Sequence, residues 1–238
     1  MIRVIDFEAT TGDEGGRVIE AGWCDLALDP VSQRWEIGAS GGYLCGVADD
    51  VPMPADARAV HHIRRGEIAG LPRFDARLFY EDAMRAGAVC LAAQGADFEA
   101  QHIMGSLPLI CTYKAALRVW PDAPAFKNFA LLYMLEDRGV EFDRDRAWPP
   151  HRAEADAYAT AVVLREIMAS GVTGADLFEW TRRPALLPTC PIGTFRGKRW
   201  ADVDSGFLTW ILRTITDRED LRYCAALELD RREEEEND

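Results

Sequence analysis

Two acidic residues come directly after the first apolar run of the chain, and they constrain how the chain can fold. Residues 1–5 are short, apolar and rich in β-branched side chains, which predicts a buried strand. Asp6-Phe7-Glu8 continues this run, and side chains alternate along a strand, so Asp6 and Glu8 point to the same face. Two carboxylates this close repel each other unless a positive charge lies between them. A hard cation with oxygen ligands, such as Mg²⁺ or Mn²⁺, is the usual solution.

The composition predicts a globular protein that stays away from membranes. The chain has 238 residues and is 48% hydrophobic, enough for a sizeable core in one or two domains. No segment approaches the roughly 20 apolar residues that cross a bilayer, and the first strand is not preceded by a signal peptide. The six cysteines are scattered without a CxxC pair, which argues against a zinc site or a disulfide framework. We therefore expect a cytoplasmic protein with reduced thiols.

The charge of the chain is unevenly distributed. A net charge of −13 argues against a nucleic-acid partner, because proteins that bind phosphate backbones usually carry a basic surface. The segment 182–199, however, contains five basic residues and no acidic one: Arg182, Arg183, Arg196, Lys198 and Arg199. This basic stripe leaves a nucleic-acid partner possible within an acidic chain.

The hydrophobic pattern predicts an α/β fold in which helices cover one mixed sheet. Strands are expected over 17–28, 35–44, 88–93 and 109–111, with a turn at 11–16 and an irregular segment over 51–72. Helical spacing occurs over 74–86, 98–104, 112–119, 126–137 and 153–168. Strands come first and helices follow, which is the order of a layered α/β domain.

The last part of the chain has a different character. Prolines at 184, 188 and 191 interrupt it, a short basic hairpin or loop is expected over 192–199, and helices over 207–215 and 218–229. We therefore predict a first domain over 1–170 and a small appended module over 171–230. Residues 231–238 form an acidic tail that we expect to be solvated and disordered.

A histidine and an aspartate form the second chemical motif. His151 follows a Pro-Pro break, and Asp156 lies in the first turns of the helix predicted over 153–168. The histidine is then on an approach loop and the aspartate on a rigid element. This arrangement suits a general base that works beside a carboxylate that holds a metal.

Three segments together resemble the motifs of the DEDDh 3′→5′ exonucleases, which share the ribonuclease H-like fold. They are Asp6-Phe7-Glu8-Ala9-Thr10, the stretch 94–99 that reads Gln-Gly-Ala-Asp-Phe-Glu, and His151 with Asp156. Val60-His61-His62-Ile63 is similar to the H-x-I segment that the family places near the terminal nucleotide. The stretches 110–121, 183–187, 193–198 and 206–210 are similar to the bacterial exonuclease X group, which would account for the appended module.

The resemblance implies a two-metal site for phosphodiester hydrolysis. Four carboxylates would hold two divalent ions, Mg²⁺ or Mn²⁺, with His151 as the general base; they are Asp6, Glu8, Glu99 and Asp156. It also implies contacts with the substrate, for which the candidates are Phe7, Thr10, His61, Ile63, Arg196 and Lys198.

The second motif departs from the family pattern. The family usually reads H-N-A-x-F-D, whereas this chain has no His-Asn pair and carries Glu99 in the position of the aspartate. Asp97 is the alternative ligand. On one helix Asp97 and Glu99 would point about 200° apart, so only one can face the metals. Register favours Glu99, and Asp97 would instead cap the helix.

The sequence thus predicts a cytoplasmic, metal-dependent 3′→5′ exonuclease that acts on DNA 3′ ends, most readily single-stranded ones. An exoribonuclease that trims RNA ends is one alternative, because that choice depends on how the sugar 2′ position is contacted. The other alternative is a catalytically weakened module that binds nucleic acid or a polymerase, which the altered second motif would favour.

Overall fold

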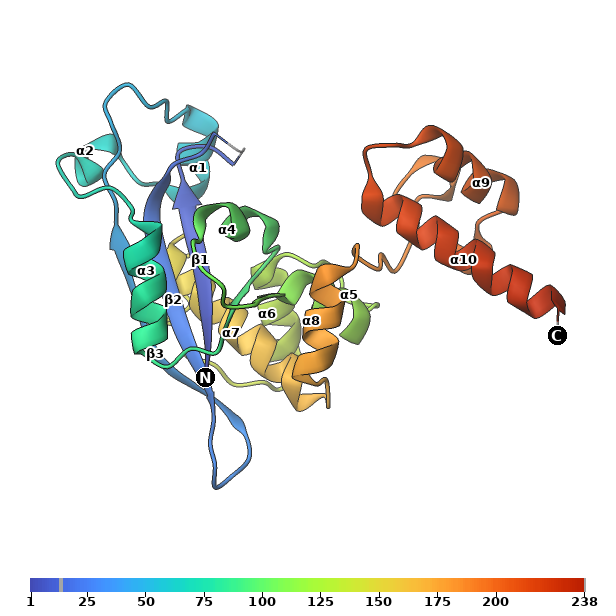
Figure 1. Cartoon of the computed structure of the whole chain (residues 1–238), viewed down its shortest axis with the longest axis horizontal. Coiled ribbons are helices and arrows are strands. Elements are labelled where there is room, and N and C mark those ends of the chain that lie inside the picture. The colour runs from blue at the N-terminus through green and yellow to red at the C-terminus, as the bar shows by residue number, and fades with distance from the viewer. Residues whose placement is uncertain (13–14, 238) are drawn as a thin grey trace.

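A five-stranded mixed sheet forms the centre of the molecule in the computed structural model, which describes residues 1–12 and 15–237 (Figure 1). The strand order is β3-β2-β1-β4-β5. Strand β2 is antiparallel to both of its neighbours, β1 and β3, whereas β4 and β5 run parallel to β1. The strands span Ile2–Ala9, Val18–Leu28, Trp35–Leu44, Cys90–Ala93 and Leu109–Cys111. This confirms the predicted mixed sheet. The turn predicted over 11–16 includes residues 13 and 14, which lie outside the described residues.

Helices cover both faces of the sheet. Helix α7 (Ala153–Ala169) packs on β1, β2 and β3, and α3 (Ala76–Arg85) covers the opposite face. The alternation along β1 sends Ile2 and Val4 into the core with α7, and Ile5 and Phe7 into the core with α3. Three further helices of this part are α4 (Asp97–His102), α5 (Thr112–Val119) and α6 (Asn128–Asp137).

Two short helices occupy part of the segment that the sequence predicts to be irregular. They are α1 (Ala55–His61) and α2 (Arg65–Ile68). Helices of seven and four residues are too short to show a clear apolar period, which explains the error. The start of α2 is stabilised by the Arg64 amide, which donates to the carboxylate of Glu67 over 2.7 Å.

A further helix, α8 (Gly174–Arg182), lies within the segment assigned to the appended module. Thr173 caps its start: the Thr173 hydroxyl accepts from the Asp176 amide, and the Asp176 carboxylate accepts from the Thr173 amide. Leu177 is buried in the core of the sheet domain, and α8 packs on β5 and α5. We therefore propose that the first domain ends after α8 and not at residue 170.

The C-terminal module has its own small core. Helices α9 (Ser205–Thr214) and α10 (Glu219–Asn237) pack on each other and stand apart from the sheet (Figure 1). The indole of Trp200 donates to the carbonyl of Leu187 over 2.7 Å in this core. The segment predicted as a hairpin or loop contains one 3₁₀ turn, Gly193–Phe195, and is closed by a bridge between Thr189 and Arg199.

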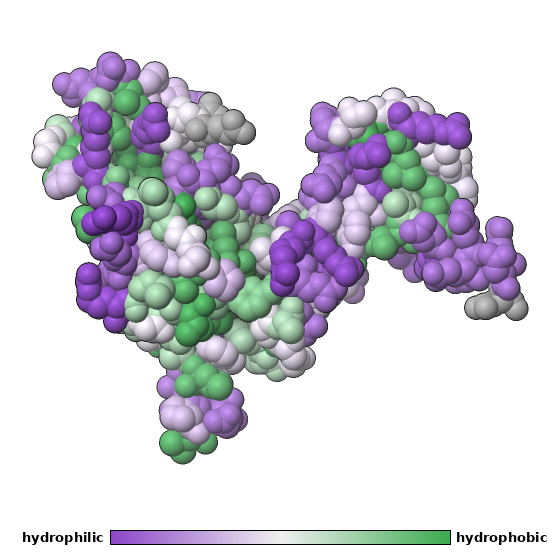
Figure 2. Space-filling view, viewed as in Figure 1, coloured by the Kyte–Doolittle hydropathy of each residue, from purple (hydrophilic) through white to green (hydrophobic). Residues whose placement is uncertain are grey.

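The acidic tail is not disordered as predicted, because residues 231–237 continue α10. Arg231 and Arg232 each form an ion pair with Glu228, one helical turn earlier, at 2.7 Å. These contacts balance part of the acidic charge along the helix. Figure 2 shows hydrophilic residues gathered along this end of α10. Asp238 lies outside the described residues.

A close contact between β2 and α7 sets the geometry beside Asp6. Gly22 is the partner of Asp6 across β1 and β2. A Cβ atom on Gly22 would lie 2.1 Å from the carbonyl carbon of Ala153 and 2.3 Å from the amide nitrogen of Glu154. The absence of a side chain therefore lets the first turn of α7 lie directly on β2, next to the acidic residues of β1.

Replacing Gly22 by alanine should force α7 away from the sheet. We expect Gly22→Ala to lower the free energy of unfolding by about 1–3 kcal/mol or more, because the new methyl group meets backbone atoms. Denaturant unfolding measures this change. Gly66→Ala is the control, since a Cβ atom on Gly66 has no neighbour within 4 Å. Equal stability of the two variants would show that the contact at Gly22 is relaxed easily.

Candidate active site

Three potential metal ligands meet where β1 passes the start of α7. Ligand atoms of Glu8, His151 and Asp156 all lie within 4.8 Å of one another. Glu8 comes from β1, Asp156 from the first turns of α7, and His151 from the loop before it. The backbone amide of His151 donates to Oδ1 of Asp156 over 3.0 Å, which ties the loop to the helix. The structure thus brings the first and third sequence motifs together.

Burial and neighbouring negative charges raise the pKa of each carboxylate of this site. Burial and the charges of Asp156 and Glu8 raise the pKa of Asp6 well above its ordinary value. Burial and the charge of Asp156 raise the pKa of Glu8 to about 8, and burial raises that of Asp156 to about 7. Arg152 lowers the pKa of Glu8 but does not offset these effects, so the ionised site needs further positive charge. A divalent cation with oxygen ligands fits this donor set, because it would supply that charge.

Glu99 is directed into the protein, and Asp97 is not. Glu99 is buried, its Oε2 atom has no hydrogen-bond partner among the described residues, and burial raises its pKa to about 8. Its charge also raises the pKa of Asp6, so Glu99 lies close enough to Asp6 for an electrostatic interaction. An orphaned, buried carboxylate oxygen near Asp6 fits a metal site. Glu99 is not within the 4.8 Å cluster of Glu8, His151 and Asp156.

The predicted cap by Asp97 is wrong. The capping position of α4 is Ala96, no side chain caps the helix, and Asp97 is its first residue. Asp97 is exposed and lines a different surface depression, with Tyr113 and the start of α10. Its carboxylate therefore points away from the acidic site.

An ion pair between the buried Glu20 and the partly exposed Arg152, which the sequence did not reveal, holds the start of α7. Glu20 lies directly across from Glu8 on β2 and is 5% exposed. The Arg152 guanidinium donates to both oxygens of Glu20 over 2.6–3.0 Å, and the Ala153 amide donates to the same carboxylate over 3.1 Å. Arg152 separates His151 from α7, so this pair positions both His151 and Asp156. In the sequence, the only sign of this pair was that the acidic residue Glu20 lies within the otherwise apolar stretch 18–22.

A cavity of about 320 Å³ adjoins Glu8. Phe7 and His61, both predicted substrate contacts, line it together with Thr11, Gly12, Ala57, Val60 and Phe98. His61 is buried, its Nδ1 accepts from the Ile63 amide over 2.9 Å, and its Nε2 has no partner among the described residues. The cavity therefore offers an aromatic surface and one free imidazole nitrogen beside a carboxylate.

The other four predicted substrate contacts do not line this cavity. Thr10 is buried, and its hydroxyl accepts from the Arg17 amide over 3.0 Å at the end of β1. Ile63 is buried in a cluster with Ile19 and Ile68, and its amide orients His61. Arg196 and Lys198 are exposed on the C-terminal module, which stands apart from the sheet (Figure 1). Substrate contact by these residues remains a prediction.

Comparison with known proteins places these features beside one group of nucleases. No protein-family model matches the sequence. Exodeoxyribonuclease 10 of Escherichia coli strain K12 is 30% identical over 227 residues, which are 90% of this chain and 92% of that protein. A solved structure of exonuclease X in complex with 5′ overhanging duplex DNA is 28% identical, with a TM-score of 0.58. The alignment covers 76% of this chain and 99% of that one.

A more distant structure shares the fold. The nuclease domain of 3′hExo, described as a DEDDh family member bound to rAMP, is 18% identical with a TM-score of 0.53. The similarity covers 74% of this chain and 94% of that domain. Among the described residues, no helix has the length and apolar character needed to cross a membrane.

Without metal, the carboxylate cluster should make stability fall as pH rises. Glu8 and Asp156 have ordinary pKa values of 4.5 and 3.8, and folding raises them to about 8 and about 7. In this window the unfolded chain releases protons that the folded chain retains, so rising pH favours unfolding. We expect the melting temperature in EDTA to fall between about pH 5 and pH 8, and Mg²⁺ or Mn²⁺ to raise it most at the higher pH.

Glu8→Gln provides the matched comparison, since it removes one ionisable group from the cluster. Its melting temperature should depend less on pH and respond less to metal than that of the wild type. The same pH slope and the same metal response in both proteins would contradict the inferred repulsion.

Loss of Arg152 should affect the protein more than loss of an exposed arginine. Arg152→Ala leaves the buried Glu20 carboxylate without its main partner, next to three other acids, and we expect about 1–3 kcal/mol lower stability. Arg144→Ala is the control, because the Arg144–Glu136 pair is largely exposed, at 68% and 33%. Chemical denaturation compares the two variants, and equal losses would show that Glu20 needs no partner.

Proposed function

Because the chain belongs to the exonuclease X family of DEDDh 3′-exonucleases, we propose that its carboxylate cluster is the catalytic site and that DNA is its substrate. Membership makes the chain a 3′→5′ exonuclease, a hydrolase of phosphodiester bonds that binds nucleic acid. The observation that carries the proposal is the convergence of Glu8, His151 and Asp156 from two distant segments within 4.8 Å.

Divalent metal ions are implied by the family, and Glu8, His151 and Asp156 lie close enough together to hold one. We assign Asp6, Glu8 and Asp156 as ligands, with Glu99 as the fourth, and we propose two ions, Mg²⁺ or Mn²⁺. Bound ions would balance the acidic cluster and stabilise the negative charge that develops on the phosphate and on the leaving 3′ oxygen. Glu99 reaches one methylene further than an aspartate, which supports its role despite its distance from the cluster.

His151 is assigned as the general base. Its side chain is exposed and its carboxylate neighbours are close, so an imidazole nitrogen can take the proton of the attacking water and release it to solvent. The backbone hydrogen bond to Asp156 and the Glu20–Arg152 pair keep the histidine beside the acids. His151 also has a left-handed backbone conformation, with φ of 61°, which turns the loop into α7.

The terminal nucleoside would occupy the cavity beside Glu8. Phe7 and His61 supply an aromatic surface and a polar nitrogen there, as binding of a base or sugar requires. Arg196 and Lys198 would contact phosphates further along the strand. The E. coli relative is named an exodeoxyribonuclease, and its group includes a complex with duplex DNA, which supports DNA as the substrate; single-stranded 3′ ends remain our preferred form. Six free, buried cysteines support a cytoplasmic location.

A cleavage assay tests the proposal. We expect the wild type with Mg²⁺ or Mn²⁺ to shorten 5′-labelled DNA stepwise from its 3′ end, on single strands and on duplexes with a 5′ overhang. Glu8→Gln should reduce the rate more than about 100-fold, beyond the usual effect of losing an outer-shell partner of a metal site. RNA of the same sequence should be shortened more slowly.

The ligand assignment on α4 has its own control within the same assay. Glu99→Gln should slow cleavage, whereas Asp97→Asn should leave it near the wild-type rate because Asp97 is exposed and points elsewhere. Inactivation by Asp97→Asn alone would reverse the assignment. A ladder on RNA but not on DNA would replace the proposed substrate, and binding without cleavage of either would refute catalysis.

A further inference from the structure

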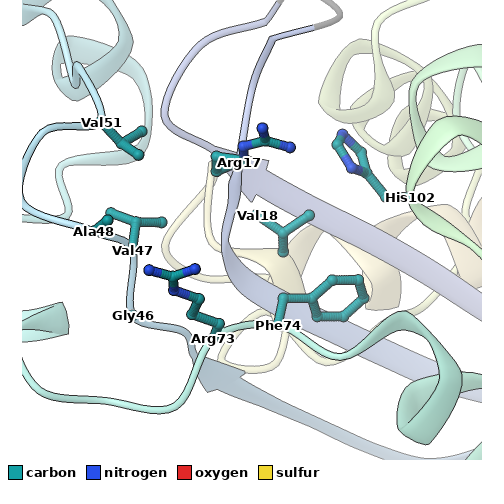
Figure 3. Close-up of a pocket in the computed structure, with 9 residues that line it drawn as sticks. All are labelled: Arg17, Val18, Gly46, Val47, Ala48, Val51, Arg73, Phe74 and His102. Atoms are coloured by element: carbon teal, nitrogen blue, oxygen red, sulfur yellow. The ribbon is translucent and has the colours of Figure 1, made fainter.

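Figure 3 shows the residues that line a second cavity, of about 500 Å³. Phe74 and His102 line it, and both rings contact Phe7, at centroid distances of 5.1 and 6.3 Å. Phe7 faces the α3 side of the sheet, whereas Asp6 and Glu8 face the α7 side. Strand β1 therefore separates the cavity from the carboxylates of Asp6 and Glu8.

Three nitrogen-bearing side chains line this cavity, and none of the described residues that line it is acidic. Arg17, Arg73 and His102 come from the start of β2, the segment before α3 and the end of α4. Figure 3 shows the Arg17 guanidinium directed toward His102, and Arg73 on the opposite side near Val47. Within the described ranges, neither arginine forms an ion pair, and Nε2 of His102 is buried without a partner.

Backbone contacts hold the segments that carry Arg73 and Arg17 in the walls of the cavity. Gly46 passes so close to the segment 71–73 that a Cβ atom would lie 2.1 Å from the Leu71 carbonyl oxygen. The Gly46 amide donates to the Pro72 carbonyl over 2.8 Å, which places Arg73 at the edge of the cavity. Arg17 is held by two hydrogen bonds to Thr10, at 2.9 and 3.0 Å.

The opposite wall is held in the same way. The guanidinium of Arg65 donates to the carbonyl oxygens of Ala48 and Val51, both of which line the cavity. Four segments distant in sequence thus meet in one preformed space.

We propose that this cavity binds a phosphate group, with Arg17 and Arg73 as its cationic ligands and His102 as a hydrogen-bond partner. Guanidinium groups bind phosphate oxygens through paired N–H donors. Two arginines that form no ion pair with another described residue are notable in a chain of net charge −13, because the surrounding field otherwise repels anions. The volume falls within the range of about 300–1,000 Å³ that is usual for small-ligand pockets, so a nucleotide could enter.

The phosphate could belong to a nucleic-acid strand or to a free nucleotide, since both present the same oxygens. This site goes beyond the proposed function, because none of the residues that line it is assigned to hydrolysis. Helix α4 carries both Glu99 and His102, so the two sites share one structural element.

Binding experiments on the full chain, carrying Glu8→Gln and kept in EDTA, test the proposal without cleavage. Calorimetric titration with inorganic phosphate and with deoxyadenosine monophosphate examines the free-nucleotide source. Fluorescence anisotropy with a 5′-overhang DNA duplex examines the strand source. The variant is Arg17→Gln with Arg73→Gln, and the control is Arg34→Gln, an exposed arginine on the β2–β3 turn.

We expect the double variant to bind at least one of these probes about tenfold or more weakly than the control, since each lost phosphate contact removes a charged hydrogen bond. If affinity falls only for inorganic phosphate and the mononucleotide, the natural ligand is a free nucleotide or phosphate. A loss confined to the duplex, with a salt dependence reduced by about two charges, assigns the strand. Because both arginines are exposed, unchanged melting temperatures should accompany either loss.

Equal affinity of the double variant and the control for all three probes would overturn the proposal. An equal loss in the Arg34→Gln control would also overturn it, because the effect would then follow net charge and not the cavity. Both results are independent of metal-dependent cleavage, so they leave the test of the exonuclease activity intact.

Discussion

Repulsion among buried carboxylates is the constraint on which this structure depends. Asp6 and Glu8 lie on one face of a central strand, and Asp156 approaches them from α7. Burial raises the pKa of all three carboxyls, and the charge of Asp156 raises those of Asp6 and Glu8 further. A fold would ordinarily avoid such an arrangement, because ionised acids in a desolvated site oppose folding. Here two features enforce it: the bare backbone of Gly22, and the ion pair between Glu20 and Arg152. The fold therefore gathers negative charge at this position, which the proposed divalent ions would balance.

The parts of this site differ in how firmly they are held. Asp6 and Glu8 are fixed by the sheet, and Asp156 by a buried helix, whereas His151 lies on an exposed loop. This difference suits the proposed roles, in which the acids hold metal ions and His151 is a base that exchanges protons with solvent. Around β1, the molecule presents an acidic face to α7 and a basic cavity, lined by Arg17 and Arg73, on its other side. Acidic and basic functions are thus separated by one strand.

The sequence revealed the parts of the site that depend on local periodicity. Alternation placed Asp6 and Glu8 together, and the helical spacing of 153–168 placed Asp156 on a buried helix. The contacts made by Gly22 and Glu20 depend on which strand faces α7, and that is known only once the sheet has formed.

Other differences between the predicted and the observed structure also come from particular contacts. The end of β1 turns Thr10 away from the cavity, where Thr11 and Gly12 take its place. The helix over 174–182 is capped by side chains but lies in a proline-rich surrounding, and the acidic tail is held in α10 by arginines one turn away. In each case a tertiary or capping contact outweighed composition.

The central claim is that the acidic cluster holds the divalent ions of an exonuclease. The most direct measurement is anomalous X-ray diffraction from crystals of the full chain soaked with Mn²⁺ and a mononucleotide. The account predicts anomalous peaks bonded to carboxylate oxygens of Asp6, Glu8 and Asp156. Peaks only at other acidic positions, such as the end of α10, with none at this cluster, would contradict it.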